Sequence, residues 1–553
     1  MSRTLAARLL DALPVALAAL VTGRVLVAMW QRWSYRWDLE WMEGGMLSHA
    51  WRLQRGLPLY DPPTAEFIPF IYPPGYSALL AAAGGLFGLD YPTGRALSIA
   101  GTLLAALAIV FVVARHTRSH VASWVGAACF LGCFRASGGF YDLVRPDAVA
   151  LGLAAWSIAL AVERRRGAEV ASGLLLAAAF LFKHNLAAFG LPIALALWIG
   201  RGRRAALMFV LSSAGPAGAM TLLLQWRSGG RMLTYLLGVP GTHPMLWERM
   251  LVGTPGELAV WLLPAVLAGA AVLVAVQRPA SWVAFGVAGA TLLGAWVGSR
   301  SSPVRGIPMG PPWAVGLMMA GLGAAVFSMA PRLARASRGQ GTGSDRWWLA
   351  FGVGGTALVI SGLMRAHYGG FLNVLMPAHW AISAGLGVAV GVARVRAGGL
   401  GTAALTAALM AGQLGWIHSR LDTAEVVPSA EERNAGAALV AELRTVCGDG
   451  PILAPHFAWV PVALGQAPSM HLISLWDINH AGGPYREEVQ RIARAASAHR
   501  WRCVLKGGRT RIGYGVEGAY EVHSRVSAPA QKLRPQTGWR VWPTEILVPR
   551  EDP

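Results

Sequence analysis

Residues 94–118 read GRALSIAGTLLAALAIVFVVARHTR, a mostly apolar run that follows Arg95 and ends in a cluster of basic side chains. A helix that spans a bilayer needs about 20 mostly apolar residues, so this stretch predicts a transmembrane helix. The whole chain has the same character, because 54% of its 553 residues are hydrophobic and only 14% are charged. Soluble domains carry about 25% charged residues. A soluble enzyme, a disordered protein and a collagen-like fibre are therefore excluded, and the fold class is an α-helical polytopic membrane protein.

Similar apolar runs recur up to residue 417 and predict about 13 transmembrane helices. The N-terminal run contains Pro14 and Arg24 and is followed by no small-residue cleavage site, so we expect a retained helix rather than a signal peptide. The run 75–88 is short and follows Pro73-Pro74, which favours a re-entrant or interfacial segment. The predicted spans lie near 9–30, 94–114, 121–141, 146–162, 168–182, 186–200, 205–226, 256–277, 280–297, 311–330, 347–364, 374–393 and 399–417.

Arginine clusters set the predicted orientation. If the N-terminus lies inside and 75–88 does not span, the clusters at 115–118, 164–166, 201–204 and 394–396 share one side, as the positive-inside rule requires. The net charge of +20 then reflects topology in the cell (inner) membrane, and nucleic acid is not an expected partner. The extracytoplasmic side would receive 31–93, 140–147, the turn at Lys183, 227–255, 298–310, 365–373 and the tail from 418.

Composition divides the chain into two predicted domains. Residues 1–417 form the expected transmembrane domain, with interfacial helices in the first outside loop, 31–93. The tail, 418–553, has a soluble composition, with a helix expected over 429–446 and short apolar runs after it, which favour a small extracytoplasmic α/β domain. Cys447 and Cys503 lie in this tail and could pair in an oxidising compartment.

Three acids stand close together in the first outside loop, in the segment WDLEWMEGG (37–45): Asp38, Glu40 and Glu43. A carboxylate crowded by other carboxylates at an apolar boundary has a raised pKa, which suits a general base. The alternative is that these acids form ion pairs with nearby arginines of a solvated loop. The sequence shows no metal-ligand spacing, so a divalent cation would have to be held by this acidic cluster.

Basic side chains stand out in three outside turns. Lys183, followed by His184, is one of only three lysines in an Arg-rich chain and ends an apolar run. An ammonium at this depth can neutralise a phosphate, whereas simple snorkelling would be served equally well by arginine. The turn at 140–147 carries Asp142, Arg145 and Asp147, where charges are costly, although they also suit a helix start.

The third turn, RAHYGGFLN (365–373), is very short and polar. It contributes Arg365, His367 and Asn373, and its Gly369-Gly370 pair would let backbone amides approach a ligand. The alternative is a tight turn with a hydrogen-bonded structural histidine.

An ordered set of segments resembles the GT-C superfamily of polytopic glycosyltransferases, which includes protein O-mannosyltransferases and lipid A aminoarabinose transferases. The segments are MEGG (42–45), RLQRGLPLY (52–60), FIPFIYPPGYSALLA (67–81), GRALS (94–98), RPDAVAL (145–151), FKHN (182–185) and HYGGFLNVLMP (367–377). The resemblance implies transfer of a sugar, usually with inversion, from a polyprenyl-phosphate donor to an extracytoplasmic acceptor such as a cell-envelope glycan, lipid or protein.

The resemblance also implies roles for individual residues. Glu43, supported by Asp38 and Glu40, would be the catalytic base. The donor phosphate would be held by Lys183, His184, Arg145 and Arg365, and the substrate would contact Asp147, Tyr72, His367 and Asn373. The family commonly has an Asp-Glu pair before the loop glycine, whereas this chain has Met42 in the first position, which leaves Asp38 or Glu40 as alternative bases.

The alternative function is a transporter or flippase of a lipid-linked glycan. Such a protein should place ionisable groups near the middle of the membrane and often has two related halves. Here the polar residues gather on one predicted face and no internal repeat is present. A scaffold for cell-envelope assembly would leave Lys183 and the acidic loop without a role.

Overall fold

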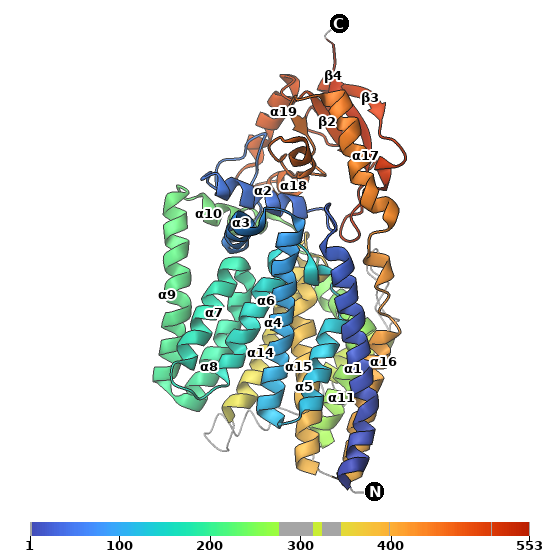
Figure 1. Cartoon of the computed structure of the whole chain (residues 1–553). Helices are drawn as coiled ribbons and strands as arrows, with labels where there is room; N and C mark the ends of the chain where they lie inside the picture. The colour runs from blue at the N-terminus through green and yellow to red at the C-terminus, as the bar shows by residue number, and fades with distance from the viewer. Residues whose placement is uncertain (1–2, 276–312, 323–343, 398, 510, 552–553) are drawn as a thin grey trace.

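The computed structural model describes residues 3–275, 313–322, 344–397, 399–509 and 511–551. Long helices run side by side in one body, and the chain after residue 418 forms an α/β unit at one end of it (Figure 1). The N-terminus lies at the opposite end of the body (Figure 1). The predicted span at 280–297 lies outside the described residues, and that at 311–330 is described only over 313–322.

Seven described helices are long and apolar enough to cross a membrane. They correspond to α1 (Arg3–Trp33), α4 (Tyr91–Thr117), α9 (Arg203–Arg227), α11 (Thr254–Ala275) with the turn before it, α14 (Ser344–Ala366), α15 (Met376–Ala397) with the turn before it, and α16 (Gly399–His418). Shorter helices stand among them: α5 (His120–Gly132), α6 (Pro146–Ala161), α7 (Ala168–Phe182) and α8 (Gly190–Arg201). The body is thus a helical membrane-protein fold, and the total of 13 spans stays a prediction.

One predicted span is shorter than its apolar run. The run 121–141 forms α5 only as far as Gly132, and the chain then turns into a 3-10 turn, η1 (Phe140–Asp142). Gly138 and Gly139 adopt left-handed φ angles of 68° and 73°, which glycine takes up most readily. This bend brings Asp142 back to Arg32, whose Nε donates to the Asp142 carboxylate at 2.8 Å in a fully buried ion pair.

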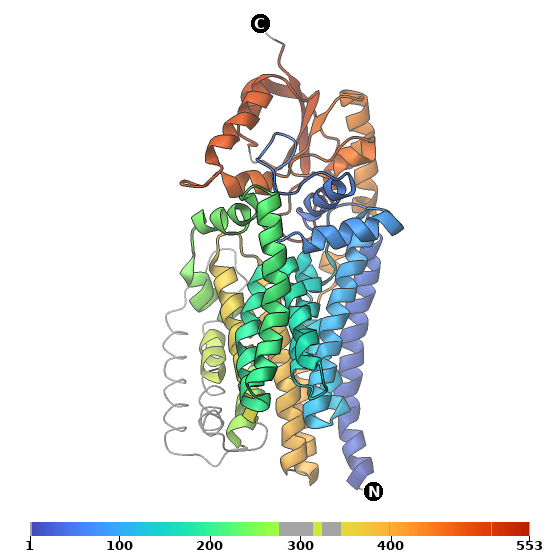
Figure 2. The same cartoon turned by 90° about the vertical axis from the view of Figure 1, so that its left-hand side faces the viewer.

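Two helices of the first outside loop lie across the direction of the long helices, at the boundary with the α/β unit. These are α2 (Glu43–Gln54) and α3 (Gly75–Phe87) (Figures 1 and 2). A helix of this length and position does not run through the body, which agrees with the expectation for 75–88. Both helices lie in the first outside loop, 31–93, where interfacial helices are expected, and the first turns of α2 are buried against the neighbouring segments.

The α/β unit contains one four-stranded sheet in the order β1-β2-β4-β3. Strand β1 (Ile452–Leu453) is parallel to β2 (Cys503–Gly507), whereas β4 (Pro543–Pro549) is antiparallel to both β2 and β3 (Tyr520–Arg525). The three apolar runs of the tail form β1, β2 and β4. Strand β3 was not predicted, because this edge strand is mostly exposed and polar. Helices α17 (Ala430–Cys447), α18 (Leu472–Ile478), α19 (Val489–Ser497) and α20 (Val516–Ala519) complete the unit.

The expected helix at 429–446 is α17, and it begins with a capping box. The Ser429 hydroxyl accepts from the Glu432 amide at 3.2 Å, while the Glu432 carboxylate accepts from the Ser429 amide at 2.7 Å. This reciprocal arrangement satisfies two amides that a helix start would otherwise leave without partners.

The unit packs on segments that come from the body. Its hydrophobic core includes Trp41 and Phe67 of the first loop and Tyr235 of the loop after α9. The Tyr235 ring stacks on Tyr485 with a centroid distance of 4.7 Å. The loop after α9 contains α10 (Arg231–Leu233), η3 (Thr234–Gly238), η4 (Pro240–Thr242) and η5 (Arg249–Gly253). A shared apolar core of this kind fixes the unit over the loops of the body.

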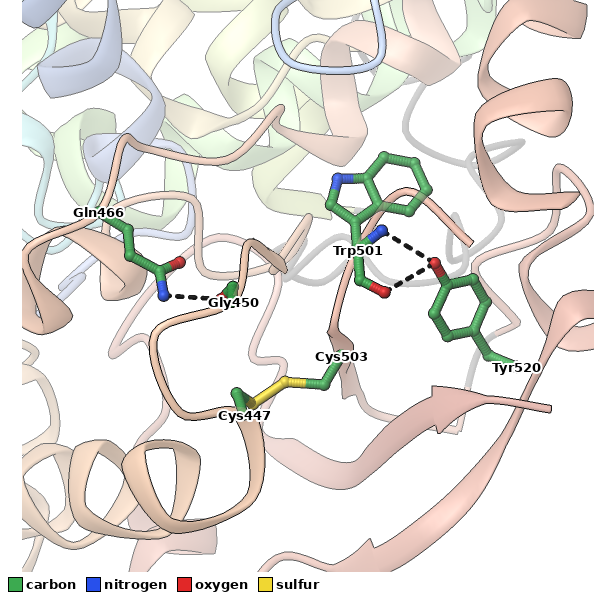
Figure 3. The surroundings of a disulfide bond; sticks show 6 residues. All are labelled: Cys447, Gly450, Gln466, Trp501, Cys503 and Tyr520. Atoms are coloured by element: carbon green, nitrogen blue, oxygen red, sulfur yellow. Dashed lines mark hydrogen bonds between the residues drawn. A yellow bond between two sulfur atoms is a disulfide. The ribbon is translucent and has the colours of Figure 1, made fainter. Parts of the chain in front are cut away.

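A disulfide joins Cys447, at the end of α17, to Cys503, at the start of β2 (Figure 3). Beside it, the Tyr520 hydroxyl bonds to both the amide and the carbonyl of Trp501, at 3.1 and 3.0 Å (Figure 3). The pairing considered from the sequence is therefore present, while Cys129 and Cys133 are buried free thiols. A disulfide of this span stabilises a fold mainly by restricting its unfolded chain.

Replacing both Cys447 and Cys503 by serine is expected to reduce the free energy of unfolding of the α/β unit by about 2–4 kcal/mol. Limited proteolysis of the purified protein should then cut the tail sooner, whereas Cys129→Ala, which removes a thiol but no disulfide, should not accelerate cleavage of the tail. Peptide mass analysis without reductant should show one linked pair. Two free thiols in the wild-type tail would contradict the assignment.

Candidate active site

Glu43 and Arg95 form a fully buried ion pair that holds the first outside loop against α4. Arg95 donates to the Glu43 carboxylate from Nε at 3.1 Å and from Nη2 at 2.8 Å. The same carboxylate accepts from the amides of Leu39 at 2.6 Å and Val144 at 2.8 Å. Arg95 also donates to three main-chain carbonyls, those of Arg32, Tyr35 and Trp37. Both Glu43 oxygens are thus engaged inside the protein, so this residue braces the loop.

Asp38 is also engaged in hydrogen bonds inside the protein. Its Oδ1 accepts from the Gly44 amide at 2.8 Å and from the Tyr91 hydroxyl at 3.0 Å. Burial, together with the nearby Glu43 carboxylate, raises the pKa of Asp38 well above its usual value. Asp38 and Glu43 do not line the cavity described next, so the structure gives them a supporting position.

Glu40, the remaining acid of the loop, lines a cavity of about 440 Å³ between the helical body and the α/β unit. Its Oε2 accepts from Arg145 Nη1 at 3.1 Å and from the Met42 amide at 3.3 Å. Its Oε1 accepts no hydrogen bond from the described residues, and a Cβ built on Gly538 would lie 2.9 Å from it. Burial raises the pKa of Glu40 to about 7, against the opposing effect of Arg145. Glu40 is therefore a cavity-facing carboxylate with one free oxygen.

Cationic side chains line the same cavity. Lys183 follows α7 and pairs through Nζ with Asp147 Oδ1, which also accepts from Asn373 Nδ2 at 2.8 Å. Asp147 lies behind Lys183 and does not itself line the cavity. Arg145, just before α6, bonds to Glu40 and donates from Nη2 to the Tyr72 hydroxyl at 2.8 Å. These contacts orient an ammonium and a guanidinium toward one space.

The cavity wall also contains buried polar atoms without a partner among the described residues. They include Arg145 Nε, His184 Nδ1 and Asn185 Oδ1. Buried polar groups in native proteins are nearly always hydrogen-bonded, so groups of this kind around a cavity indicate a place for a polar ligand. His184 and Asn185 begin η2 (His184–Phe189), where the chain passes from α7 to α8.

Arg365 and Arg249 both line the cavity but differ in their pairing. Arg365 donates to the Glu257 carboxylate from Nη2 at 2.8 Å and from Nε at 3.0 Å, so its charge is already balanced. Arg249 was not singled out in the sequence. It donates to the Tyr368 carbonyl at 3.4 Å and forms no ion pair with a carboxylate of the described residues. Arg249 is thus the better placed of the two to meet an anion.

The turn after α14 places His367 and Asn373 in the cavity wall. Its two glycines do not offer amides to a ligand as expected, because the Gly370 amide donates to the His367 carbonyl at 2.8 Å and the Gly369 amide bonds to His367 Nδ1 at 3.3 Å. A Cβ at Gly370 would lie 2.0 Å from the Met364 carbonyl oxygen. The requirement for glycine here is therefore a tight turn.

Asp477, which was not predicted from the sequence, lies in α18 of the α/β unit and lines the cavity. Burial raises the pKa of Asp477 to about 7, against the effect of Arg145. The motif around it, LWDIN, has no catalytic pattern, so only the docking of the unit onto the body reveals its position. Eight of the residues expected at the site do line this cavity: Glu40, Lys183, His184, Arg145, Arg365, Tyr72, His367 and Asn373.

The three acids of the first loop do not converge on one point, since each has different partners. Among the residues that the structure describes, no group of three or more His, Cys, Asp or Glu side chains is arranged to hold a metal ion. The idea of a divalent cation held by the acidic loop therefore receives no support from the arrangement of these side chains.

No family model and no curated protein matches this chain. Among solved structures, the chain is similar to ArnT from Cupriavidus metallidurans in the apo state, with 15% identity, a TM-score of 0.46, and coverage of 96% of this chain and 97% of that one. It is likewise similar to the same ArnT bound to undecaprenyl phosphate, with 14% identity and a TM-score of 0.44 over the same shares of the chains.

Glu43→Gln is expected to destabilise the protein, because it leaves the buried Arg95 guanidinium without its counter-charge. Breaking a buried ion pair costs about 3–5 kcal/mol. Thermal unfolding of the purified protein in detergent, followed by tryptophan fluorescence, should show a clear loss of stability for Glu43→Gln. Glu521→Gln, the same change at an exposed acid, should cost much less. Equal stability of the two variants would contradict the bracing role of Glu43.

Proposed function

We propose that this protein is an integral-membrane glycosyltransferase that takes a sugar from a polyprenyl-phosphate donor and transfers it to an acceptor outside the cytoplasm. The observation that carries the proposal is the cavity in which Glu40, with one free carboxylate oxygen, shares a wall with Lys183 and Arg145. A transfer of this kind needs a carboxylate on the acceptor side and cations on the phosphate side. The cavity supplies both at the end of a helical membrane body.

In the proposed reaction, a hydroxyl oxygen of the acceptor attacks the anomeric carbon of the sugar and forms the new C–O bond. The bond between that carbon and the phosphate oxygen breaks, and its electron pair leaves with the lipid phosphate. Glu40 accepts the hydroxyl proton at Oε1. Lys183, Arg145 and Arg249 stabilise the charge that develops on the leaving phosphate. A single displacement inverts the configuration at the anomeric carbon.

The other site residues predicted from the sequence have supporting roles in this proposal. Glu43 and Asp38 hold the loop that presents Glu40, and Asp147 and Asn373 orient Lys183. Arg365 is tied to Glu257 and shapes the wall, while Tyr72 positions Arg145. The membrane is proposed to be the inner membrane, with the cavity and the α/β unit facing outward.

Substitutions of the proposed base and of a phosphate-binding cation should impair different steps. Glu40→Gln should still bind undecaprenyl phosphate in detergent but transfer sugar at least about 100-fold more slowly, since the general base is lost. Lys183→Ala should bind undecaprenyl phosphate more weakly and also lose transfer. Lipid extracts of a deletion strain carrying either variant should contain an accumulated polyprenyl-phosphate sugar, which mass spectrometry detects.

A strain carrying Glu521→Gln, an exposed acid far from the cavity lining, serves as the matched control and should match wild type. Wild-type levels of the lipid-linked sugar in both Glu40→Gln and Lys183→Ala strains would contradict the proposed transferase. Movement of a lipid-linked glycan across vesicles of purified protein, without transfer, would instead support a flippase.

The pH dependence follows from the pKa of Glu40, which burial raises to about 7. A general base works in its deprotonated form, so kcat/KM should fall as the pH drops below about 7 and level off above it. Asp477 also titrates near 7 in the same cavity. The fall should therefore persist in Asp477→Asn, measured with the same membranes across pH 5 to 9. Its disappearance in that variant would assign the titration to Asp477 and contradict the role of Glu40.

A further inference from the structure

Asp477 is a carboxylate placed in the cavity without a partner of its own. Its side chain is 15% exposed and accepts no hydrogen bond from the described residues. The nearest cationic candidate is His243, whose Nε2 lies 3.9 Å from Oδ1 but donates to the Asp477 main-chain carbonyl at 3.0 Å. Burial lowers the pKa of His243 to about 4, so this ring is neutral near pH 7 and gives Asp477 no counter-charge.

The main chain of Asp477 is held firmly while its carboxylate is left free. His243 anchors the carbonyl, and the His243 ring packs on those of His480 and His367 with centroid distances of 4.4 and 5.0 Å. A fixed residue with an unused acceptor, in a cavity, is arranged to bind a group that donates hydrogen bonds.

Aromatic rings line the same cavity as this carboxylate. Trp476, its chain neighbour, packs on Trp41 and Trp539 with centroid distances of 5.9 and 5.2 Å, and Trp41 and Trp539 meet edge to face at 4.9 Å. Trp41 and Trp539 both line the cavity. Indole rings offer an apolar surface to the C–H groups of a sugar, and a neighbouring carboxylate accepts from its hydroxyls.

We propose that Asp477, Trp41 and Trp539 form the subsite for the transferred sugar, in which Asp477 accepts hydrogen bonds from sugar hydroxyls. The α/β unit would thereby complete the active site. The subsite adjoins the proposed base, since Glu40 precedes Trp41 in the chain and Glu40 Oε1 lies beside Gly538, the residue before Trp539. This inference rests on the proposed function, because it assumes a glycosylated polyprenyl phosphate as donor.

The test compares binding of bare undecaprenyl phosphate with binding of a panel of its glycosylated forms, which carry different hexoses and pentoses. Full-length protein in nanodiscs is used with wild type, Asp477→Asn, Asp477→Ala and the exposed-acid control Glu521→Gln. Wild type should bind at least one glycosylated form more tightly than bare undecaprenyl phosphate. Asp477→Ala should lose about 10- to 100-fold of affinity for that form, the effect of a hydrogen bond to a charged group.

Asp477→Ala should bind bare undecaprenyl phosphate like wild type, and Asp477→Asn, which keeps an acceptor oxygen, should fall between the two for the glycosylated form. The sugar subsite is overturned if Asp477→Ala weakens both ligands equally or neither, or if no glycosylated form binds wild type more tightly than the bare lipid. Failure of wild type to bind either lipid would instead overturn the proposed function.

Discussion

The buried ion pair between Glu43 and Arg95 is the contact on which the site depends. It fixes the start of α2 to α4, and through the amides of Leu39 and Val144 it ties the acidic loop to the turn before α6. A buried charge tolerates no loss of its partner, so this arrangement permits few alternative loop conformations. Its consequence is that Glu40 turns toward the cavity and meets Arg145. Glu43 thus stabilises the loop, whereas Glu40 lines the cavity.

The α/β unit contributes residues to the cavity as well as packing on the helical body. It shares an apolar core with the first loop and the loop after α9, and the disulfide between Cys447 and Cys503 links its first helix to its sheet. Docked in this way, it delivers Trp539 and Asp477 to a cavity whose cations come from the body.

Much of this arrangement was predictable from the sequence, for physical reasons. The requirement for long apolar runs reveals helices such as α4, and the charge rule for loops placed Glu40 and Lys183 at the same end, where the structure also has them. Which of the three neighbouring acids lines the cavity was not predictable, because this depends on which acid pairs with Arg95, a residue far along the chain. Arg249 and Asp477 were missed because their places follow from tertiary packing. The short α5 was missed because its apolar run continues beyond Gly132 into a turn, which contains the left-handed Gly138 and Gly139.

The most direct test of the central claim is a cryo-electron microscopy structure of the full-length protein in nanodiscs with undecaprenyl phosphate bound. The lipid phosphate should lie within hydrogen-bonding distance of Lys183 Nζ, with the Glu40 carboxylate facing the space next to it and Glu43 still paired with Arg95. A phosphate bound away from Lys183 and Arg145, or a Glu40 side chain turned out of the cavity toward the protein interior, would contradict the account.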